Sequence, residues 1–225
     1  VELTGSTGGT FTSTRTSEGD GTLSIDRETG AITPSTSTPG IYRITYTVGV
    51  GDCITTAVTD VTIYESPVVT NNSTYAICSG GNTNITLTAS IPSSFRWTLG
   101  EVSSNILDAS AGSGSSINQV LSNISYTEPG TVEYVVIPTS NVDPNSCAGA
   151  PFIITVTVSP NPQLVINEPD AVCSPLTVNL QDAAVTAGST ASLTLSYWTD
   201  YEATTELANP SAITTSGTYY IKGTT

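Results

Sequence analysis

Apolar and polar residues alternate along most of the chain, with the period of two that a half-buried β-strand requires. The alternation is clearest over residues 41–48, and residues 54–64 and 151–159 form two longer runs rich in β-branched side chains. Between the runs lie turn signals, which are Gly8-Gly9, Asp20-Gly21, Thr29-Gly30, Pro39-Gly40, Gly80-Gly81, Pro129-Gly130, Asp143-Pro144-Asn145 and Ser216-Gly217. This pattern predicts an all-β fold of Ig-like β-sandwiches. Residues 104–123 are predicted to be a long loop with one short strand.

The pattern repeats at a spacing of about 90 residues, which is the size of a small domain. Cys53 and Cys147 are 94 positions apart, and Cys78 and Cys173 are 95 apart. Two further markers repeat with them: a Gly-led aromatic strand (Pro39-Gly40-Ile41-Tyr42, Pro129-Gly130-Thr131-Val132 and Ser216-Gly217-Thr218-Tyr219) and an earlier strand (Val1–Thr4, Ile85–Thr88 and Val178–Gln181). We therefore expect a tandem array of three domains, over 1–66 (the first segment), 67–160 (the middle segment) and 161–225 (the third segment).

Register within the repeat predicts that the middle segment is complete. The first segment would lack its N-terminal part and the third its C-terminal part. The joints Ile63–Pro67 and Val158–Pro162 contain proline, which fixes φ and removes a backbone donor. The array is therefore predicted to be a semi-rigid rod.

The repeated cysteines predict disulfides and an oxidising, extracellular compartment. A bond between Cys78 and Cys147 would close a loop of about 70 residues, worth roughly 4 kcal/mol in the chain-entropy model. Cys53 and Cys173 are expected to pair outside the chain, with cysteines shortly before Val1 and shortly after Thr225. The alternative, buried thiols in a cytosolic protein, does not account for the repeated positions.

Charge and residue types narrow the function. The 5 Lys and Arg residues stand against 19 Asp and Glu, a net charge of −14, which argues against binding to nucleic acid or to anionic lipid. No apolar run is long enough to span a membrane. His is absent and Lys222 is the one lysine, so Ser-His-Asp and Cys-His arrangements are excluded. We expect no enzymatic activity and no catalytic residue.

Acidic turns are the candidates for a cation or for acid-base chemistry. Glu18/Asp20 and Asp26/Glu28 are paired carboxylates, but they lie in turn-rich segments without the facing cleft that glycoside hydrolysis needs. With Asp170 they could offer oxygen ligands to calcium, although no spaced D-x-D-x-D loop occurs. The alternative is that Asp26 and Asp143 accept hydrogen bonds from their own turns. We therefore expect no cofactor, with calcium as the exception left open.

Other distinctive side chains have structural explanations. Trp97 and Trp198 follow Cys78 and Cys173, and are expected to be core aromatics rather than platforms for sugars. The same holds for the tyrosines of the Gly-led strand: Tyr42, Tyr46, Tyr134, Tyr219 and Tyr220. Asn-x-Ser/Thr triplets begin at Asn71, Asn72, Asn84 and Asn123, as chance produces in a chain rich in Ser and Thr.

The middle segment resembles the PKD-like repeats of giant surface proteins from Bacteroidota. The matching runs are Cys78-Ser79-Gly80, Thr86-Leu87-Thr88, Phe95-Arg96-Trp97-Thr98, Ile117, Leu121-Ser122-Asn123, Tyr134 to Pro138, Cys147-Ala148-Gly149 and Val156 to Pro162. The first segment resembles Ig-like modules of the same proteins in Gly8 to Phe11, Leu23 to Asp26, Thr29 to Ile32 and Ser37 to Tyr42. The third resembles another of their repeat classes in Tyr197 to Asp200, Asn209 to Ile213 and Ser216 to Gly223.

The resemblance implies the stalk of a very long adhesin of the SprB type. Such an adhesin would be exported by the type IX secretion system, attached to the outer membrane and used in surface attachment and gliding. Its partners would be neighbouring repeats of the same polypeptide, surface polysaccharides and the gliding or secretion machinery. Two alternatives stay open: spacer or carbohydrate-binding modules of a secreted hydrolase, and cargo bound to the export machinery.

Overall fold

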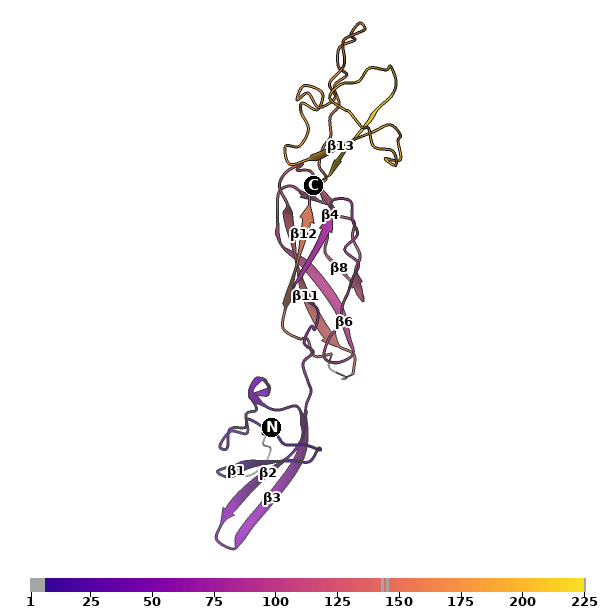
Figure 1. The fold of residues 1–225 in the computed structure, drawn as a ribbon. Helices are drawn as coiled ribbons and strands as arrows, with labels where there is room; N and C mark the ends of the chain where they lie inside the picture. Colours follow the sequence, from indigo (N-terminus) through magenta and orange to yellow (C-terminus); the bar gives the residue numbers. More distant parts are fainter. Residues whose placement is uncertain (1–6, 143, 145, 225) are drawn as a thin grey trace. The chain divides into compact units, whose positions relative to one another are not determined.

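The computed structural model describes residues 7–142, 144 and 146–224, and their secondary structure is all-β (Figure 1). One 3-10 turn, η1 (Pro34–Thr36), is the exception within these residues. The chain divides into two compact units, of which one comprises Val1–Thr70, Thr88–Ser94 and Ile137–Ala150, and the other Asn71–Leu87, Phe95–Val136 and Pro151–Thr225. The predicted fold class is confirmed. The predicted domain bounds and the rod stay predictions.

The first segment contains a three-stranded antiparallel sheet in the order β1-β2-β3. Its strands are β1 (Thr10–Arg15), β2 (Gly40–Val50) and β3 (Cys53–Ile63). The register pairs Phe11 with Tyr46 and Gly40 with Ile63. The two long strands match the runs of the sequence: β2 exceeds the run 41–48 by three residues, and β3 begins and ends one residue earlier than the run 54–64. The predicted strand over Val1–Thr4 lies outside the described residues.

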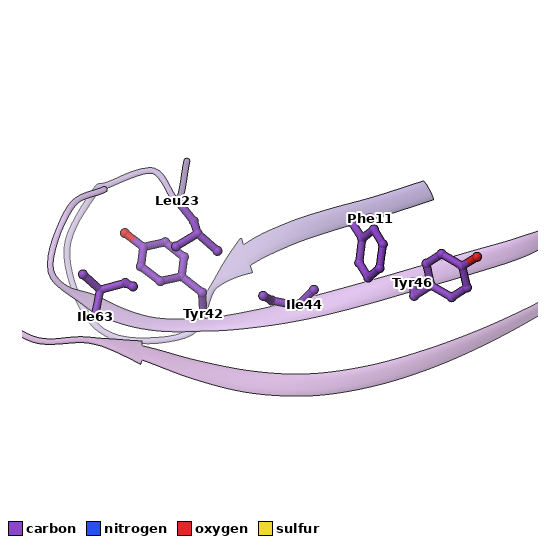
Figure 2. Close-up of a cluster of buried hydrophobic side chains, with 6 residues drawn as sticks. All are labelled: Phe11, Leu23, Tyr42, Ile44, Tyr46 and Ile63. Carbon is purple, nitrogen blue, oxygen red and sulfur yellow. The ribbon is translucent and has the colours of Figure 1, made fainter. Parts of the chain in front are cut away.

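Alternate residues of β2 form the apolar core of this sheet. Its buried cluster consists of Phe11, Leu23, Tyr42, Ile44, Tyr46 and Ile63 (Figure 2). The rings of Phe11 and Tyr46 lie 4.6 Å apart between their centroids. Gly30 passes directly beneath Phe11 with φ of +71°, so a side chain there would meet the ring 2.9 Å away. The period-two pattern thus places its apolar residues on the inner face, as predicted.

The middle segment is a sandwich built on a five-stranded sheet in the order β4-β12-β11-β6-β8. These strands are β4 (Thr74–Cys78), β6 (Ser93–Val102), β8 (Gly112–Ser113), β11 (Gly130–Ser140) and β12 (Phe152–Ser159). Every second residue of β11 is buried, and the side chains of Val132, Tyr134, Val136, Ile154, Val156 and Val158 are fully enclosed. Two small strand pairs, β5 with β9 and β7 with β10, complete the sandwich.

Residues 104–123, predicted as a loop with one short strand, contain more strands than expected. They hold β7 (Ile106–Leu107), β8, β9 (Ser116–Ile117) and β10 (Ser122–Asn123), while β5 (Ile85–Thr86) lies earlier. Strands of two residues are too short to show an alternating pattern. Their apolar members, Ile106 and Ile117, are nevertheless buried, because they face strands far away in the sequence.

The third segment has one strand pair, β13 (Thr194–Trp198) with β14 (Tyr220–Thr224), joined in antiparallel register. Isolated bridges connect Val178 to Ile213 and Trp198 to Glu206. The strand predicted over Val178–Gln181 is therefore reduced to a single bridged residue. Turns and irregular chain make up the rest of its described residues.

The repeat in the sequence coincides with a repeat in how the strands pair. Gly40 faces Ile63 across the β2–β3 pair, and Gly130 faces Val158 across the β11–β12 pair. Ile63 and Val158 are 95 positions apart, the same spacing as Cys78 and Cys173. Both Gly-led strands are 11 residues long. The first two segments therefore share one hairpin, with a cysteine in or after its connection.

Candidate functional site

The cysteines are the site residues that the sequence singles out. Cys78 ends β4, where it faces Ser159 of β12. Cys53 begins β3 and Cys173 lies in irregular chain. These three cysteines are exposed free thiols in this structure. The carbonyl of Cys147 accepts a hydrogen bond from the N–H of Ser140, at 2.9 Å.

The expected pairing of Cys78 with Cys147 stays a prediction. Cys78 lies next to the Gly130 end of β11, because Gly130 faces Val158, the neighbour of Ser159. Cys147 contacts Ser140, at the other end of the strand. Spacing in the sequence does not tell which end of a sheet a residue occupies.

The partners expected for Cys53 and Cys173 lie outside the described residues. Those two pairings stay predictions. Both thiols are exposed and accessible to a partner.

The side chain of Arg15 binds the backbone of the acidic loop Glu18–Asp20. The guanidinium of Arg15 donates from Nη2 to the Glu18 carbonyl and from Nη1 to the Asp20 carbonyl, both at 3.2 Å. Its Nε donates to Ser17 Oγ at 3.0 Å. Backbone oxygens of this loop, which would be natural calcium ligands, are therefore already engaged.

The Asp26 side chain accepts hydrogen bonds from the backbone of its own turn, as the alternative interpretation of the sequence predicted. Its Oδ1 accepts hydrogen bonds from the N–H groups of Thr29 (2.7 Å) and Glu28 (2.9 Å). These bonds, that from Thr29 first, lower the pKa of the Asp26 carboxyl. Asp200 repeats the arrangement, since bonds from the backbone of Thr204 and then Thr205 lower its pKa. Asp143 lies outside the described residues.

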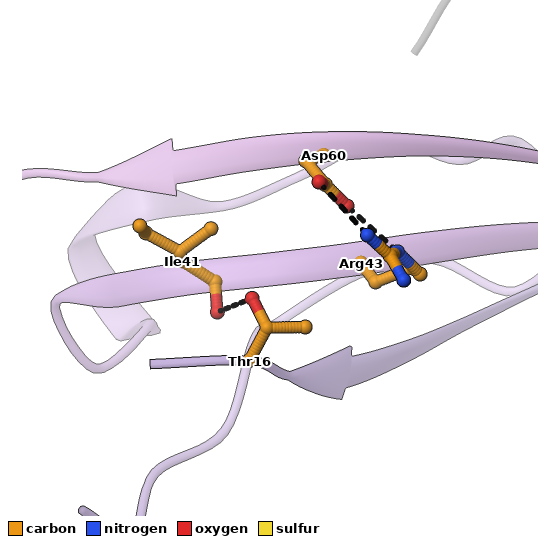
Figure 3. Close-up of polar contacts among 4 residues, drawn as sticks. All are labelled: Thr16, Ile41, Arg43 and Asp60. Atoms are coloured by element: carbon orange, nitrogen blue, oxygen red, sulfur yellow. Dashed lines mark hydrogen bonds and ion pairs between the residues drawn. The ribbon is translucent and has the colours of Figure 1, made fainter. Parts of the chain in front are cut away.

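An exposed ion pair fixes the β2–β3 register on the outer face of the first sheet (Figure 3). Arg43 Nε lies 3.0 Å from Asp60 Oδ1, and the two residues face each other directly. The hydrogen bond from Arg43 lowers the pKa of the Asp60 carboxyl. Thr16 Oγ1 donates to the Ile41 carbonyl nearby, at 3.2 Å. Exposed pairs of this kind contribute little to stability.

The aromatic side chains are mostly core residues, as expected. Trp97 is buried and donates from Nε1 to the Ser110 carbonyl at 3.2 Å. In the third segment the buried aromatic is Tyr197, whereas Trp198 is half-buried and donates to Ser196 Oγ. Tyr42, Tyr46 and Tyr134 are buried; Tyr219 and Tyr220 are half-buried. The expectation for Trp198 was therefore shifted by one residue, which turns a side chain to the opposite face of a strand.

The side chain of Asn123 joins several parts of the middle segment by hydrogen bonds. From the sequence alone, Asn123 appeared only as the start of one of several Asn-x-Ser/Thr triplets that arise by chance. Its Nδ2 donates to the carbonyls of Glu128 and Val158, each at 2.9 Å. Its Oδ1 accepts from the Ser125 N–H and from Asn105 Nδ2. The side chain is buried, so it is not accessible to a glycan.

A groove of about 840 Å³ lies in the third segment. Apolar side chains line most of it, among them Ile166, Val172, Leu176, Ile213 and Ile221. Three of these, Ile166, Val172 and Leu176, are exposed. No motif in the sequence pointed to this groove, because its lining residues lie far apart along the chain.

Neither a metal centre nor a membrane span is found among residues 7–142, 144 and 146–224. Groups of three or more Cys, Asp or Glu side chains placed to hold an ion do not occur in these ranges. Over the same residues, the structure contains no helix with the length and apolar character needed to cross a bilayer.

The comparisons with known proteins agree with the architecture of the middle segment. Residues 75–162 match the family model of the PKD-like domain. No curated protein matches the chain. The family match supports an Ig-like module of a structural or adhesion type, and PKD-like domains are typically extracellular and non-catalytic.

Solved structures show only distant likeness. EC1-3 of mouse protocadherin-24 shares 15% identity at a TM-score of 0.34, over 84% of this chain and 69% of that chain. Human CDH23 EC21-23 shares 14% at a TM-score of 0.28, over 69% of this chain and 62% of that chain. The cadherin-like domains 1 to 4 of zebrafish RET share 13% at a TM-score of 0.21, over 84% of this chain and 50% of that chain.

Proposed function

We propose that this chain is a stalk segment of a large secreted adhesin or filament, displayed on the surface of a Gram-negative cell. Its role would be mechanical: it spaces and projects binding regions during surface attachment and gliding. The proposal is supported by the PKD-like match over residues 75–162.

The observation that carries the proposal is the recurrence of one hairpin in successive segments. Gly40 faces Ile63 and Gly130 faces Val158 in matching register, about one domain apart. A structural unit repeated in this way suits an array, whose length and valency grow with the number of units. An enzyme instead concentrates its functional groups in one pocket.

The joints support a mechanical role. Ser159 is followed by Pro160-Asn161-Pro162, which limits the backbone freedom between one sandwich and the next residues. Asn161 Nδ2 donates to the Ser79 carbonyl at 3.2 Å, and so ties this joint to the end of β4. Such a joint resists bending more than a Gly/Ser linker does.

Location and phenotype test the proposal in the cells that make the protein. An antibody raised against this chain should label intact cells, and in-frame deletion of the segment should reduce attachment and gliding while export continues. A deletion that removes a second region of similar length from the same polypeptide is the matched control for shortening. Recovery of the protein in the medium with a linked hydrolase activity would favour the spacer alternative and contradict the adhesin.

A further inference from the structure

The first and last strands of the middle segment lie side by side and run in the same direction. Strand β4 pairs with β12 in parallel, from Thr74 facing Thr155 to Cys78 facing Ser159. The chain enters this sheet through the residues before β4 and leaves it through the residues after β12. Tension along the polypeptide therefore pulls on the N-terminal end of β4 and on the C-terminal end of β12.

These two points of attachment lie at opposite ends of the parallel pair. The pull acts along the two strands in opposite directions, so it loads the hydrogen bonds between them in shear, and these bonds share the load. The bonds at the two ends run from the Thr155 N–H to the Ser73 carbonyl, at 2.8 Å, and from the Ser79 N–H to the Ser159 carbonyl, at 2.9 Å. A strand pair that is pulled from one end instead opens one bond at a time.

The two strands are held in the sandwich in different ways. Strand β12 lies between β4 and β11, and its inner residues Ile154, Val156 and Val158 are fully buried. Strand β4 lies at the edge of the sheet, and none of its residues is buried. Apolar packing thus holds β12 more firmly than β4. The resistance of β4 to a pull depends mainly on its bonds to β12.

A second group of hydrogen bonds closes the end of the pair where the chain leaves the sheet. Ser79 Oγ accepts from the Asn123 N–H at 2.9 Å and donates to the Asn123 carbonyl at 3.3 Å. Asn123 Nδ2 in turn donates to the Val158 carbonyl at 2.9 Å. Asn161 Nδ2 donates to the Ser79 carbonyl at 3.2 Å. The end of β12 is therefore tied both to β4 and to β10.

We infer that the β4–β12 pair is the force-bearing clamp of the middle segment, and that the contact between Ser79 and Asn123 is its lock. This inference rests on the proposed mechanical role of the chain. Under tension the sandwich keeps its length until the β4–β12 bonds rupture. The whole sandwich, about 90 residues, then unfolds in one step and lengthens the chain by about 300 Å.

The direction of pulling tests the clamp by single-molecule force spectroscopy on the 225-residue chain. The four native cysteines are replaced by Ser, and handles are attached through two introduced cysteines. Asn72→Cys with Pro162→Cys loads the pair in shear, whereas Asn72→Cys with Pro151→Cys pulls both strands from one end. The rupture force in shear should be at least about twofold higher, because the bonds then break together and not in turn.

Variants locate the lock. Ser79→Ala removes both hydroxyl bonds at the loaded end and should speed unfolding at constant force in shear by about tenfold. Thr83→Val is the matched control, because Thr83 Oγ1 also donates to one carbonyl, that of Ile117, and accepts one N–H, that of Gln119, away from the clamp. It should lower stability in urea to a similar degree and change the rate under force by less than about twofold, since forced unfolding follows the unfolding rate and not the equilibrium.

Three results would overturn the inference. Equal rupture forces in the two directions would show that shear of the β4–β12 pair does not bear the load. A released length well below that of the sandwich would place the resistance elsewhere. Equal acceleration by Ser79→Ala and Thr83→Val would mean that the force follows overall stability.

The force measurement is independent of the cellular tests of the proposed function. A strong clamp in a protein that cells do not display would contradict the proposed function alone. A weak clamp in a protein that cells do display would contradict this inference alone.

Discussion

At the scale of single residues, buried polar side chains with complete sets of partners specify the middle segment. Asn123 is the main example, because one amide holds four groups from separate parts of the chain. We expect Asn123→Ala to lower the free energy of unfolding by about 1–3 kcal/mol, since it leaves buried partners unsatisfied. Urea unfolding measures the loss. Asn72→Ala, at an exposed triplet, is the control and should change nothing; an equal loss in both variants would contradict the assignment.

Tyr134 should make stability depend on alkaline pH. Burial raises the pKa of its hydroxyl to about 12, and this hydroxyl donates to Gln119 Oε1 at 2.9 Å. The folded protein therefore holds the proton more tightly than the unfolded chain. The resulting stability is complete below pH 10 and is lost as the pH rises from 10 towards 12. Tyr134→Phe should flatten this dependence in thermal melts, whereas Tyr201→Phe, at an exposed ring, should keep it.

Single residues also show what could be predicted. The turn role of Asp26 follows from neighbours two and three positions away, so local reasoning was sufficient. The role of Asn123 depends on Val158, 35 residues away. A lone sequence gives no sign of such a partner, because its position is decided by the packing of the sheets.

At the scale of elements, long strands were predictable and short ones were not. Strands β2, β11 and β12 each carry enough alternation to reveal an inner face. Strands β7 to β10 have two residues each and form because a neighbouring layer pairs with them. Repeat spacing likewise identifies equivalent cysteines without showing which of them pair.

Thiol labelling tests the placement of Cys78. The structure leaves this thiol exposed at the end of β4. The native 225-residue protein, purified without reductant, should therefore react with iodoacetamide at Cys78, as mass spectrometry of its peptides will show. Cys78→Ser should leave the urea midpoint unchanged. A protected Cys78 that becomes reactive after reduction would contradict the placement.

At the scale of the whole molecule, we expect the protein to be stable without a bound ion. The Arg15 guanidinium already engages the carbonyls of Glu18 and Asp20. Removal of calcium with a chelator should accordingly shift the melting temperature very little, because stabilisation by a ligand requires a site that holds it. Calorimetry with added calcium and with the chelator measures this. A loss of many degrees on chelation would show that the acidic turns bind calcium.

The most direct test of the central claim is to express the three segments separately and to unfold each of them. The middle segment, 67–160, contains most of the fully buried side chains and a sheet of five strands, so it should unfold in one cooperative transition with an all-β circular dichroism spectrum. Residues 1–66 and 161–225, with three strands and two strands described, should show broad transitions or none. An unfolded middle segment, or outer segments as stable as the middle one, would contradict a tandem array of sandwiches with these bounds.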